Sequence, residues 1–232
     1  RRPASVRKRV IVAGGGPGGM KAAAVLAERG HDVTLHESGI RLGGQALLAQ
    51  MLPGREEFGG IVTNLSRECE LAGVQVFTKS VVDRALIDDE QPDVVVLATG
   101  AGPRHVDFEV SEEAHIVESW QVLRGEVNVG RSVVIADWRC DWIGLGLAEK
   151  LARDGCSVRL CTNGYMPGET IQQYVRDSWL GTMHQLGVEI IPLVRLFGAD
   201  KNTVYLQHTT SGDPVLCEDV DTLVLSMGHE PS

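Results

Sequence analysis

The stretch LAERGHDVTLHESG at residues 26–39 returns in outline as LARDGCSVRLCTNG at residues 151–164, which is 125 positions later (151 minus 26). Each copy is typical of a helix end, a glycine that stops the helix, and a strand followed by a turn. Three ordered repeats at nearly one offset indicate two related dinucleotide-type folds in tandem. The other two repeats are Val10–Ala13 with Val133–Ala136, and residues 93–103 with residues 221–231.

The order of apolar runs and helical patterns sets the fold class. In the first half, short β-branched runs alternate with helical stretches, beginning with a strand at Arg9–Ala13 and a helix from Pro17 to Arg29. This alternation is the doubly wound pattern, so we predict an α/β fold of two tandem Rossmann-like, doubly wound units. Further expected strands are 33–36, 74–77, 94–98, 132–136, 157–161, 188–191, 204–208, 215–218 and 222–226, and further helices are 56–71, 119–123, 144–153 and one within 169–186.

These elements divide the chain into four parts. We expect a linker at residues 1–8, a first dinucleotide-type domain at 9–104, a connection at 105–130 and a second domain at 131–232. Because the chain begins without Met and ends just after a glycine turn, we interpret it as a piece of a longer polypeptide.

Composition narrows the class of protein. The net charge of −9 argues against nucleic acid and anionic membranes as partners, apart from the short basic start RRPASVRKR. No run approaches the ~20 apolar residues of a membrane span, and no signal peptide follows the basic start. The five cysteines form no CxxC pair, which disfavours a redox disulfide, zinc or iron–sulfur site within these residues. A reduced, cytoplasmic protein is therefore expected.

A glycine-rich motif after the first strand is the main candidate site. The sequence Gly14-Gly15-Gly16-Pro17-Gly18-Gly19 contains GxGxxG at Gly14, Gly16 and Gly19, between a strand and a helix. Such glycines permit a tight turn, a close approach of backbone to pyrophosphate, and close packing of helix on strand. The helix start then offers free N–H groups to phosphate. A plain glycine-rich turn is the alternative interpretation.

Two further features extend this motif. Glu37 follows the second strand, where an acid accepts hydrogen bonds from ribose hydroxyls and favours an unphosphorylated ribose, as in FAD, NAD or ADP, over NADP. The segment Arg41-Leu-Gly43-Gly44-Gln45 supplies a second glycine pair, interpreted as backbone contact with a pyrophosphate or flavin, with Arg41 or Gln45 as donors. A flexible loop is the alternative for this segment.

The second unit lacks the same fingerprint. After its first strand the chain reads Asp137-Trp-Arg-Cys-Asp-Trp142-Ile-Gly144-Leu-Gly146, so that the glycines arrive late, inside the predicted helix. Asp137 and Asp141 would repel phosphate, and the position that reads the ribose falls near Thr162–Asn163. The pattern argues against ordinary NAD binding here and favours a retained fold whose ligand function has drifted.

Catalytic chemistry is not visible in these residues. We find no Tyr-x-x-x-Lys pair and no arrangement of a nucleophile with a base. His184 and His208 fall in patterned segments and are expected to be surface residues rather than general bases. No catalytic residue and no metal ligand is therefore assigned.

At GGGPGG (14–19), Glu37, LGGQ (42–45), LATG (97–100) and LSMGHEP (225–231), the chain resembles the two-dinucleotide-binding-domain flavoproteins. Within them it looks most like the C-terminal region of the trimethylamine dehydrogenase, histamine dehydrogenase and 2,4-dienoyl-CoA reductase family of iron–sulfur flavoproteins. The resemblance covers essentially the whole chain. Segments that look like the amine-dehydrogenase and N-demethylase branch are QQYVRD (172–177), LFGAD (196–200) and TVYLQHTTSG (203–212).

This resemblance implies a cofactor and partners. The first unit would bind FAD, or ADP alone, with Val81 adding backbone contact at the adenine and Thr99–Gly100 lying at the domain crossing. An N-terminal flavin-bearing barrel with FMN and a 4Fe-4S cluster would precede this region and carry out the oxidation of an amine. The full enzyme would form an oligomer. The alternatives are a structural ADP-binding module without redox function and an NADH-dependent flavin reductase component.

Overall fold

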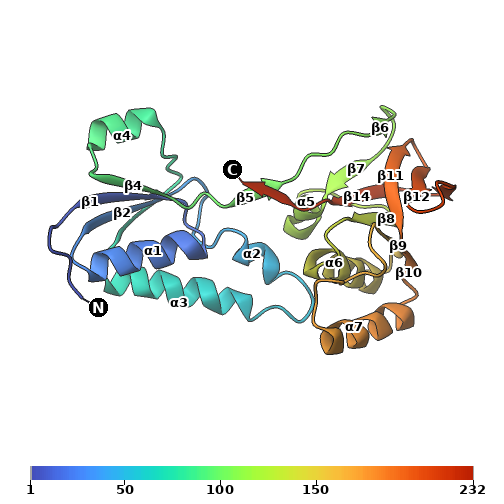
Figure 1. Ribbon diagram of the computed structural model, residues 1–232, viewed down its shortest axis with the longest axis horizontal. Helices are drawn as coiled ribbons and strands as arrows, with labels where there is room; N and C mark the ends of the chain where they lie inside the picture. The colour runs from blue at the N-terminus through green and yellow to red at the C-terminus, as the bar shows by residue number, and fades with distance from the viewer. Residues whose placement is uncertain (1, 232) are drawn as a thin grey trace. The chain divides into compact units, whose positions relative to one another are not determined.

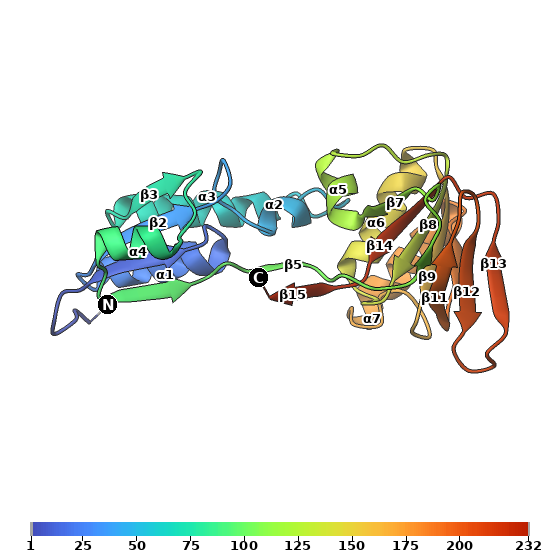
Figure 2. The same cartoon turned by 90° about the horizontal axis from the view of Figure 1, so that it is seen from above.

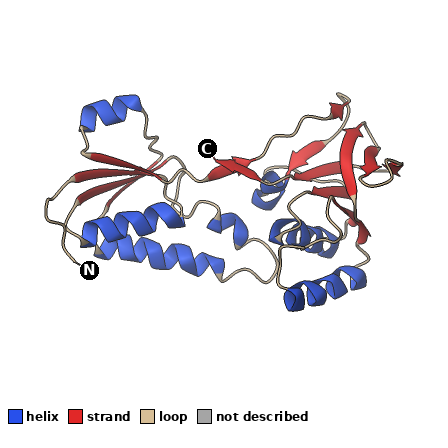
Figure 3. Cartoon of the chain, in the orientation of Figure 1, coloured by secondary structure: helices blue, strands red, loops and turns tan. Residues whose placement is uncertain are grey.

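The structure is a computed structural model that describes residues 2–231. Its contacts divide the chain into unit 1, which runs to Gly102 and includes Pro231, and unit 2, Pro103–Glu230 (Figure 1). Each unit contains a parallel sheet with helices packed on it, as Figure 3 shows by element type. The short strands β5 (Ala101–Pro103) and β15 (His229–Pro231) form a separate two-stranded sheet.

The sheet of unit 1 has four parallel strands in the order β3-β2-β1-β4. Alternate residues of the strands, among them Val10, Val12, Val33 and Leu35, are buried on one face. This order places β1 between β2 and β4, which is the switch point of a doubly wound sheet. The strands are β1 (Arg9–Ala13), β2 (Asp32–Glu37), β3 (Gln75–Thr78) and β4 (Val94–Leu97).

The apolar face of this sheet is covered by two helices, α1 (Pro17–Glu28) and α3 (Phe58–Leu71). Met20 and Ala24 of α1 and Cys69 of α3 belong to this core. Two short helices complete the unit: α2 (Ala46–Ala49) and α4 (Arg84–Glu90), which buries none of its residues.

Unit 2 carries a five-stranded parallel sheet in the order β10-β9-β8-β14-β7, of which β9, β8, β14 and β7 are labelled in Figure 2. The helices packed near it are α5 (Ser119–Arg124), α6 (Trp142–Arg153) and α7 (Gln173–Gln185). The strands are β7 (Ile116–Glu118), β8 (Ser132–Asp137), β9 (Ser157–Thr162), β10 (Glu189–Ile191) and β14 (Thr222–Ser226).

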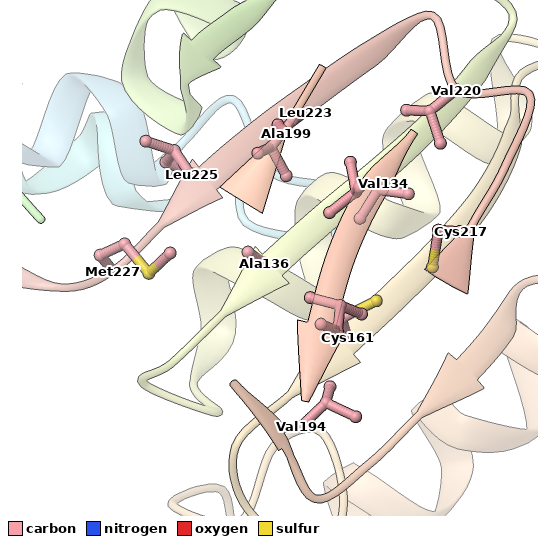
Figure 4. Close-up of a cluster of buried hydrophobic side chains, with 12 residues drawn as sticks. Val134, Ala136, Cys161, Val194, Ala199, Cys217, Val220, Leu223, Leu225 and Met227 are labelled. Carbon is pink, nitrogen blue, oxygen red and sulfur yellow. The ribbon is translucent and has the colours of Figure 1, made fainter. Parts of the chain in front are cut away.

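A second sheet in unit 2, of order β13-β12-β11-β6, packs on the face of the parallel sheet away from α6. Val134 and Leu223 of the parallel sheet meet Val194 and Ala199 of this second sheet in one buried apolar core (Figure 4). Its strands are β6 (Glu109–Val110), β11 (Val194–Ala199), β12 (Val204–His208) and β13 (Pro214–Cys217), and β12 and β13 form an antiparallel hairpin.

The predicted strands and long helices are present, with bounds that shift by one or two residues. The sequence did not predict the helices α2 and α4 or the strands β5, β6, β7, β11 and β15. It placed the start of α6 at Gly144, whereas the helix begins at Trp142 because the side chain of Asp141 caps it by accepting from the Ile143 amide. Within the described residues, no helix is long and apolar enough to cross a membrane.

Candidate nucleotide-binding site

The predicted site residues of unit 1 gather at the carboxyl ends of its parallel strands. Gly14 follows β1, Glu37 ends β2, Val81 lies just beyond β3 and Thr99 just beyond β4. In an open α/β sheet this edge, at the switch point, is where ligands bind. Four segments that are far apart in the sequence therefore contribute to one edge.

Close packing explains two of the glycines in the turn between β1 and α1. Gly14 has φ +110° and a Cβ there would collide with the backbone carbonyl of Ala98. A Cβ on Gly19 would collide with the carbonyl oxygen of Gly14. The first and third glycines of the motif thus let the backbone of the turn pack directly against the end of β4 and the start of α1, with no side chain between them.

The start of α1 is open. Gly16 is its N-cap residue, with φ −72° and ψ 176°, and supplies no side chain to cap the helix; Pro17 occupies the first helical position. A Cβ at Gly18 would meet nothing within 4 Å. Among residues 2–231, no side chain accepts from the amides of Gly16, Gly18 or Gly19. These N–H groups and the positive end of the helix suit an anionic ligand.

Glu37 is held firmly beside this turn. Its Oε2 accepts from the Gly15 amide at 2.7 Å, and its Oε1 accepts from the Gly39 amide at 2.6 Å. The Ser38 hydroxyl also donates to Oε1, at 3.3 Å, so it is Oε2 that keeps a further lone pair for a hydroxyl donor. The acid predicted to read the ribose is therefore already oriented by the fingerprint loop.

The second glycine pair packs directly on the first. The amide of Gly43 donates to the carbonyl of Gly15 at 2.8 Å, and a Cβ on Gly44 would come within 3.0 Å of the Gly16 Cα. Both residues have positive φ, which explains the glycines. Arg41, in the same segment, is exposed.

Two contacts that sequence reasoning missed fix the remaining loops. The Gln45 side chain donates to the carbonyl of Ala101 at 2.9 Å, which fixes the segment of Thr99 and Gly100. Buried His36 lies 2.9 Å from Ser80 Oγ, which anchors the residue before Val81. Burial lowers the pKa of His36, and the nearby Glu90 carboxylate opposes this shift. Strand β2 reads Asp32-Val-Thr-Leu-His-Glu37, with polar residues at several positions, so its pattern gave no signal that His36 is buried.

A different pocket, of about 280 Å³, lies at the opposite edge of the same sheet. Arg9, Asp32 and Gln75, the first residues of β1, β2 and β3, line it. None of the fingerprint glycines contributes to it. The pocket is therefore separate from the candidate site.

The corresponding turn of unit 2 is built differently. Asp137, at the end of β8, is fully buried, and its Oδ1 accepts from the amides of Cys140 at 3.0 Å and Arg139 at 3.2 Å. Its Oδ2 is buried with no hydrogen-bond partner. Burial, with the Asp141 carboxylate as the next cause, raises the pKa of Asp137 to about 7. Burial likewise raises the pKa of the Cys140 thiol to about 11.

The structure corrects the interpretation that the glycines of unit 2 arrive late. Gly144 does lie inside α6, as predicted, but it is the third residue of that helix, just as Gly19 is the third residue of α1. The third glycine of the fingerprint is therefore retained. The residues that replace the first two are Asp137, which ends the strand, and Asp141, which caps the helix.

The tryptophans of this region pack within unit 2. Trp138 lies against the buried core between the two sheets, and the ring of Trp142 lies 5.5 Å from that of Trp179. All five cysteines are free, and no group of three or more potential metal ligands occurs within residues 2–231.

Comparison with known proteins decides the family. The profile of the family described as "Pyridine nucleotide-disulphide oxidoreductase" matches residues 8–232. The chain belongs to this family. This match confirms the predicted fold class, two dinucleotide-type units in tandem. It also confirms the expectation that the chain is part of an oxidoreductase.

The relatives of this chain include a dehydrogenase and a probable demethylase. It is 39% identical over 171 residues to the N,N-dimethylglycine/sarcosine dehydrogenase of Chromohalobacter salexigens, covering 71% of this chain and 25% of that protein. It is 35% identical over 199 residues to a probable N-methylproline demethylase of Rhizobium meliloti, covering 86% of this chain and 29% of that protein. The chain thus spans about a quarter to a third of the length of these relatives.

Among solved structures, histamine dehydrogenase from Rhizobium sp. 4-9 superimposes with a TM-score of 0.91 at 21% identity, covering 99% of this chain and 37% of that one. At this identity the match concerns the fold. Together with the relatives, it confirms the predicted resemblance to the trimethylamine dehydrogenase, histamine dehydrogenase and 2,4-dienoyl-CoA reductase family.

Proposed function

We propose that unit 1 binds an adenine nucleotide, FAD or ADP, at the carboxyl ends of β1–β4. The observation that carries this proposal is the start of α1, where the backbone amides of a glycine-rich turn have no side-chain partner among the described residues and a Cβ at Gly18 would meet nothing within 4 Å. An anion is the ligand that such a helix start favours. The residues therefore fit a pyrophosphate.

Each part of the nucleotide has a matching group in the chain. The pyrophosphate would lie at Gly14, Gly16, Pro17 and Gly19, and Glu37 would accept from the ribose hydroxyls. The backbone near Val81 would contact the adenine. The Gly43–Gly44 turn, which packs on Gly15 and Gly16, would form a second wall, with Arg41 or Gln45 as donors.

Whether the ligand carries electrons depends on which nucleotide binds. A bound FAD supplies two-electron redox chemistry at its flavin ring, whereas ADP supplies none. In either case the residues of unit 1 orient the phosphates and the ribose and do not themselves react. Thr99 and Gly100, held by Gln45 through Ala101, complete the edge toward which a longer nucleotide would extend.

For the whole protein we propose an amine dehydrogenase or N-demethylase. The two relatives named above, whose names describe reactions of methylated amines, support this class. Because the chain spans only 25% and 29% of their lengths, the proposal places the catalytic barrel, with its FMN and 4Fe-4S cluster, elsewhere in the polypeptide or complex. The same proposal includes an oligomeric full enzyme and a cytoplasmic location.

The ligand can be identified directly. We would denature the purified chain and analyse the released nucleotide by absorbance and mass spectrometry. Release of FAD would support a redox role for unit 1, and release of ADP would support a structural role. An empty protein that also fails to bind added FAD and ADP would refute the proposal.

A pair of matched variants tests the position of the site. Gly16 has the extended backbone of an N-cap residue, so Gly16→Asp can cap α1 and keep the fold while it takes the amides from the ligand. We expect nucleotide retention to be lost. The control is Gly60→Asp, in the first turn of α3, where a Cβ meets nothing within 4 Å. Equal nucleotide content in the two variants would contradict the assignment.

A further inference from the structure

The turn between β8 and α6 holds two carboxyl groups at the place where a dinucleotide fold receives its phosphates. The strand repeat places Asp137 at the position of Gly14 (136 answers 13, and 137 answers 14). The helix starts place Asp141 at the position of Gly16, because each is an N-cap residue, and Gly144 at that of Gly19. The two turns can therefore be compared residue by residue.

In unit 2, carboxylate side chains of the turn itself accept hydrogen bonds from the backbone amides of the turn and of the helix start. Asp137 Oδ1 accepts from the amides of Arg139 and Cys140, and Asp141 Oδ1 accepts from that of Ile143 at 2.9 Å. In unit 1 the counterpart of Ile143 is Gly18, whose amide has no side-chain partner among the described residues. The hydrogen bonds that a pyrophosphate would receive are thus already made.

The carboxyl group of Asp137 also fills space. A Cβ on Gly19 would collide with the Gly14 carbonyl, whereas a Cβ on Gly144 would collide with the Asp137 side chain. The side chain is therefore inserted between the end of β8 and the first turn of α6. Its second oxygen, Oδ2, is buried there without a hydrogen-bond partner, although it lies at the start of a helix.

The one basic side chain of the turn is occupied as well. Arg139 Nε lies 3.3 Å from Asp141 Oδ2, so its charge is paired within the turn. A phosphate that approached would meet the Asp141 carboxylate and would receive no unpaired cation from these residues in return. Thr162, the last residue of β9, offers a buried hydroxyl rather than an acid for a ribose.

We infer that Asp137 and Asp141 act as built-in substitutes for phosphate and close the dinucleotide site of unit 2, so that this unit does not bind a pyridine nucleotide. NADH would then not deliver electrons through unit 2. This conclusion goes beyond the proposed function, because it holds whether unit 1 binds FAD or ADP. It also removes the NADH-dependent reductase component from the possible roles of unit 2.

Hydrogen exchange measured by mass spectrometry tests the inference on the purified wild-type chain saturated with ADP. The segment around residues 14–20 is expected to be protected by ADP, which serves as the internal positive control. Addition of millimolar NADH is expected to leave exchange at residues 138–146 unchanged. Slower exchange of that segment with NADH would overturn the inference, even if unit 1 binds no ADP.

Two double variants test the role of the carboxyl groups. Asp137→Gly with Asp141→Gly vacates the amides, whereas Asp137→Asn with Asp141→Asn keeps a hydrogen-bond acceptor at both positions. We expect the glycine pair to gain protection by NADH, about tenfold slower exchange at a concentration about ten times the dissociation constant. The asparagine pair is expected to gain none.

Circular dichroism establishes first that each variant is folded. If the folded glycine pair gains no protection, the carboxyl groups are not what closes the site, and the inference fails. If the glycine pair does not fold, Asp141→Gly alone is the replacement, since Asp141 is partly exposed; protection of this variant by NADH supports the inference, and its absence opposes it.

Discussion

The carboxyl group of Asp137 lies against Gly144, so that unit 2 places a side chain where unit 1 places only backbone. In unit 1 the corresponding neighbours are Gly14 and Gly19, and a Cβ on Gly19 would meet the Gly14 carbonyl. Both units need a glycine as the third residue of the helix. They need it for different reasons, namely a backbone carbonyl in one and a buried carboxyl in the other.

This contact predicts the effect of Gly144→Ala. The added methyl would collide with a carboxyl group that two amide hydrogen bonds hold in place, so we expect a loss of about 1–3 kcal/mol in the free energy of unfolding. Urea unfolding measures this loss. The control is Gly181→Ala in α7, where a Cβ meets nothing within 4 Å and alanine should add about 0.5–1 kcal/mol. A gain in both variants would contradict the contact.

A second prediction concerns pH. Burial raises the pKa of Asp137 to about 7, with Asp141 as the next cause, whereas an aspartate in the unfolded chain titrates near about 3.9. Between these values the folded state binds more protons than the unfolded state. The free energy of unfolding should therefore fall as pH rises through this window, by a few kcal/mol at most.

Asp137→Asn removes this titration while keeping an acceptor for the two amides. Urea unfolding at about pH 5 and about pH 8 should show that the variant gains stability relative to the wild type at the higher pH. In Asp141→Asn the carboxylate that raises the pKa of Asp137 is absent, so the fall should end at a lower pH. If the difference in the free energy of unfolding between Asp137→Asn and the wild type were the same at both pH values, the titration would not belong to Asp137.

A third prediction concerns Glu37. Its carboxylate accepts from the amides of Gly15 and Gly39, so Glu37→Gln points an NH2 group at one of these donors. We expect a loss of about 1–3 kcal/mol in stability and about tenfold weaker binding of ADP. Urea unfolding and calorimetric titration measure the two effects. Glu70→Gln, on the exposed surface of α3, should change neither by a measurable amount. Unchanged ADP affinity in Glu37→Gln would restrict Glu37 to a structural role.

Much of the architecture could be predicted because the deciding signals are local. The β-branched runs at Val10 and Val133 and the glycines at Gly30 and Gly155 mark strand and helix ends in both halves, and the repeat aligns them. Strand β11 escaped prediction because it pairs antiparallel with β12 through an irregularity at Leu196 and Gly198, which breaks the simple alternation of a strand.

The candidate site was predictable only as a set of motifs. The spacing of Gly14, Gly16 and Glu37 indicates a dinucleotide turn, but no spacing rule says that Gly43 packs on Gly15. Nor did the sequence reveal how His36 anchors Ser80, because that contact joins residues 44 positions apart. In unit 2, two inserted residues hid the equivalence of Gly144 and Gly19 until both helix starts were seen.

The hydrogen bond from Gly43 to Gly15 joins two turns 28 residues apart (43 minus 15). Residues 9–37 contain every residue of the fingerprint, from Gly14 to Glu37. A peptide of that length would nevertheless lack the Gly43–Gly44 turn that packs on Gly15 and Gly16. The site is thus a product of the assembled unit and not of a transplantable segment. If unit 1 binds a nucleotide as proposed, the amount bound would measure the fraction of molecules in which both turns are packed together, and so would report on the completion of folding in unit 1.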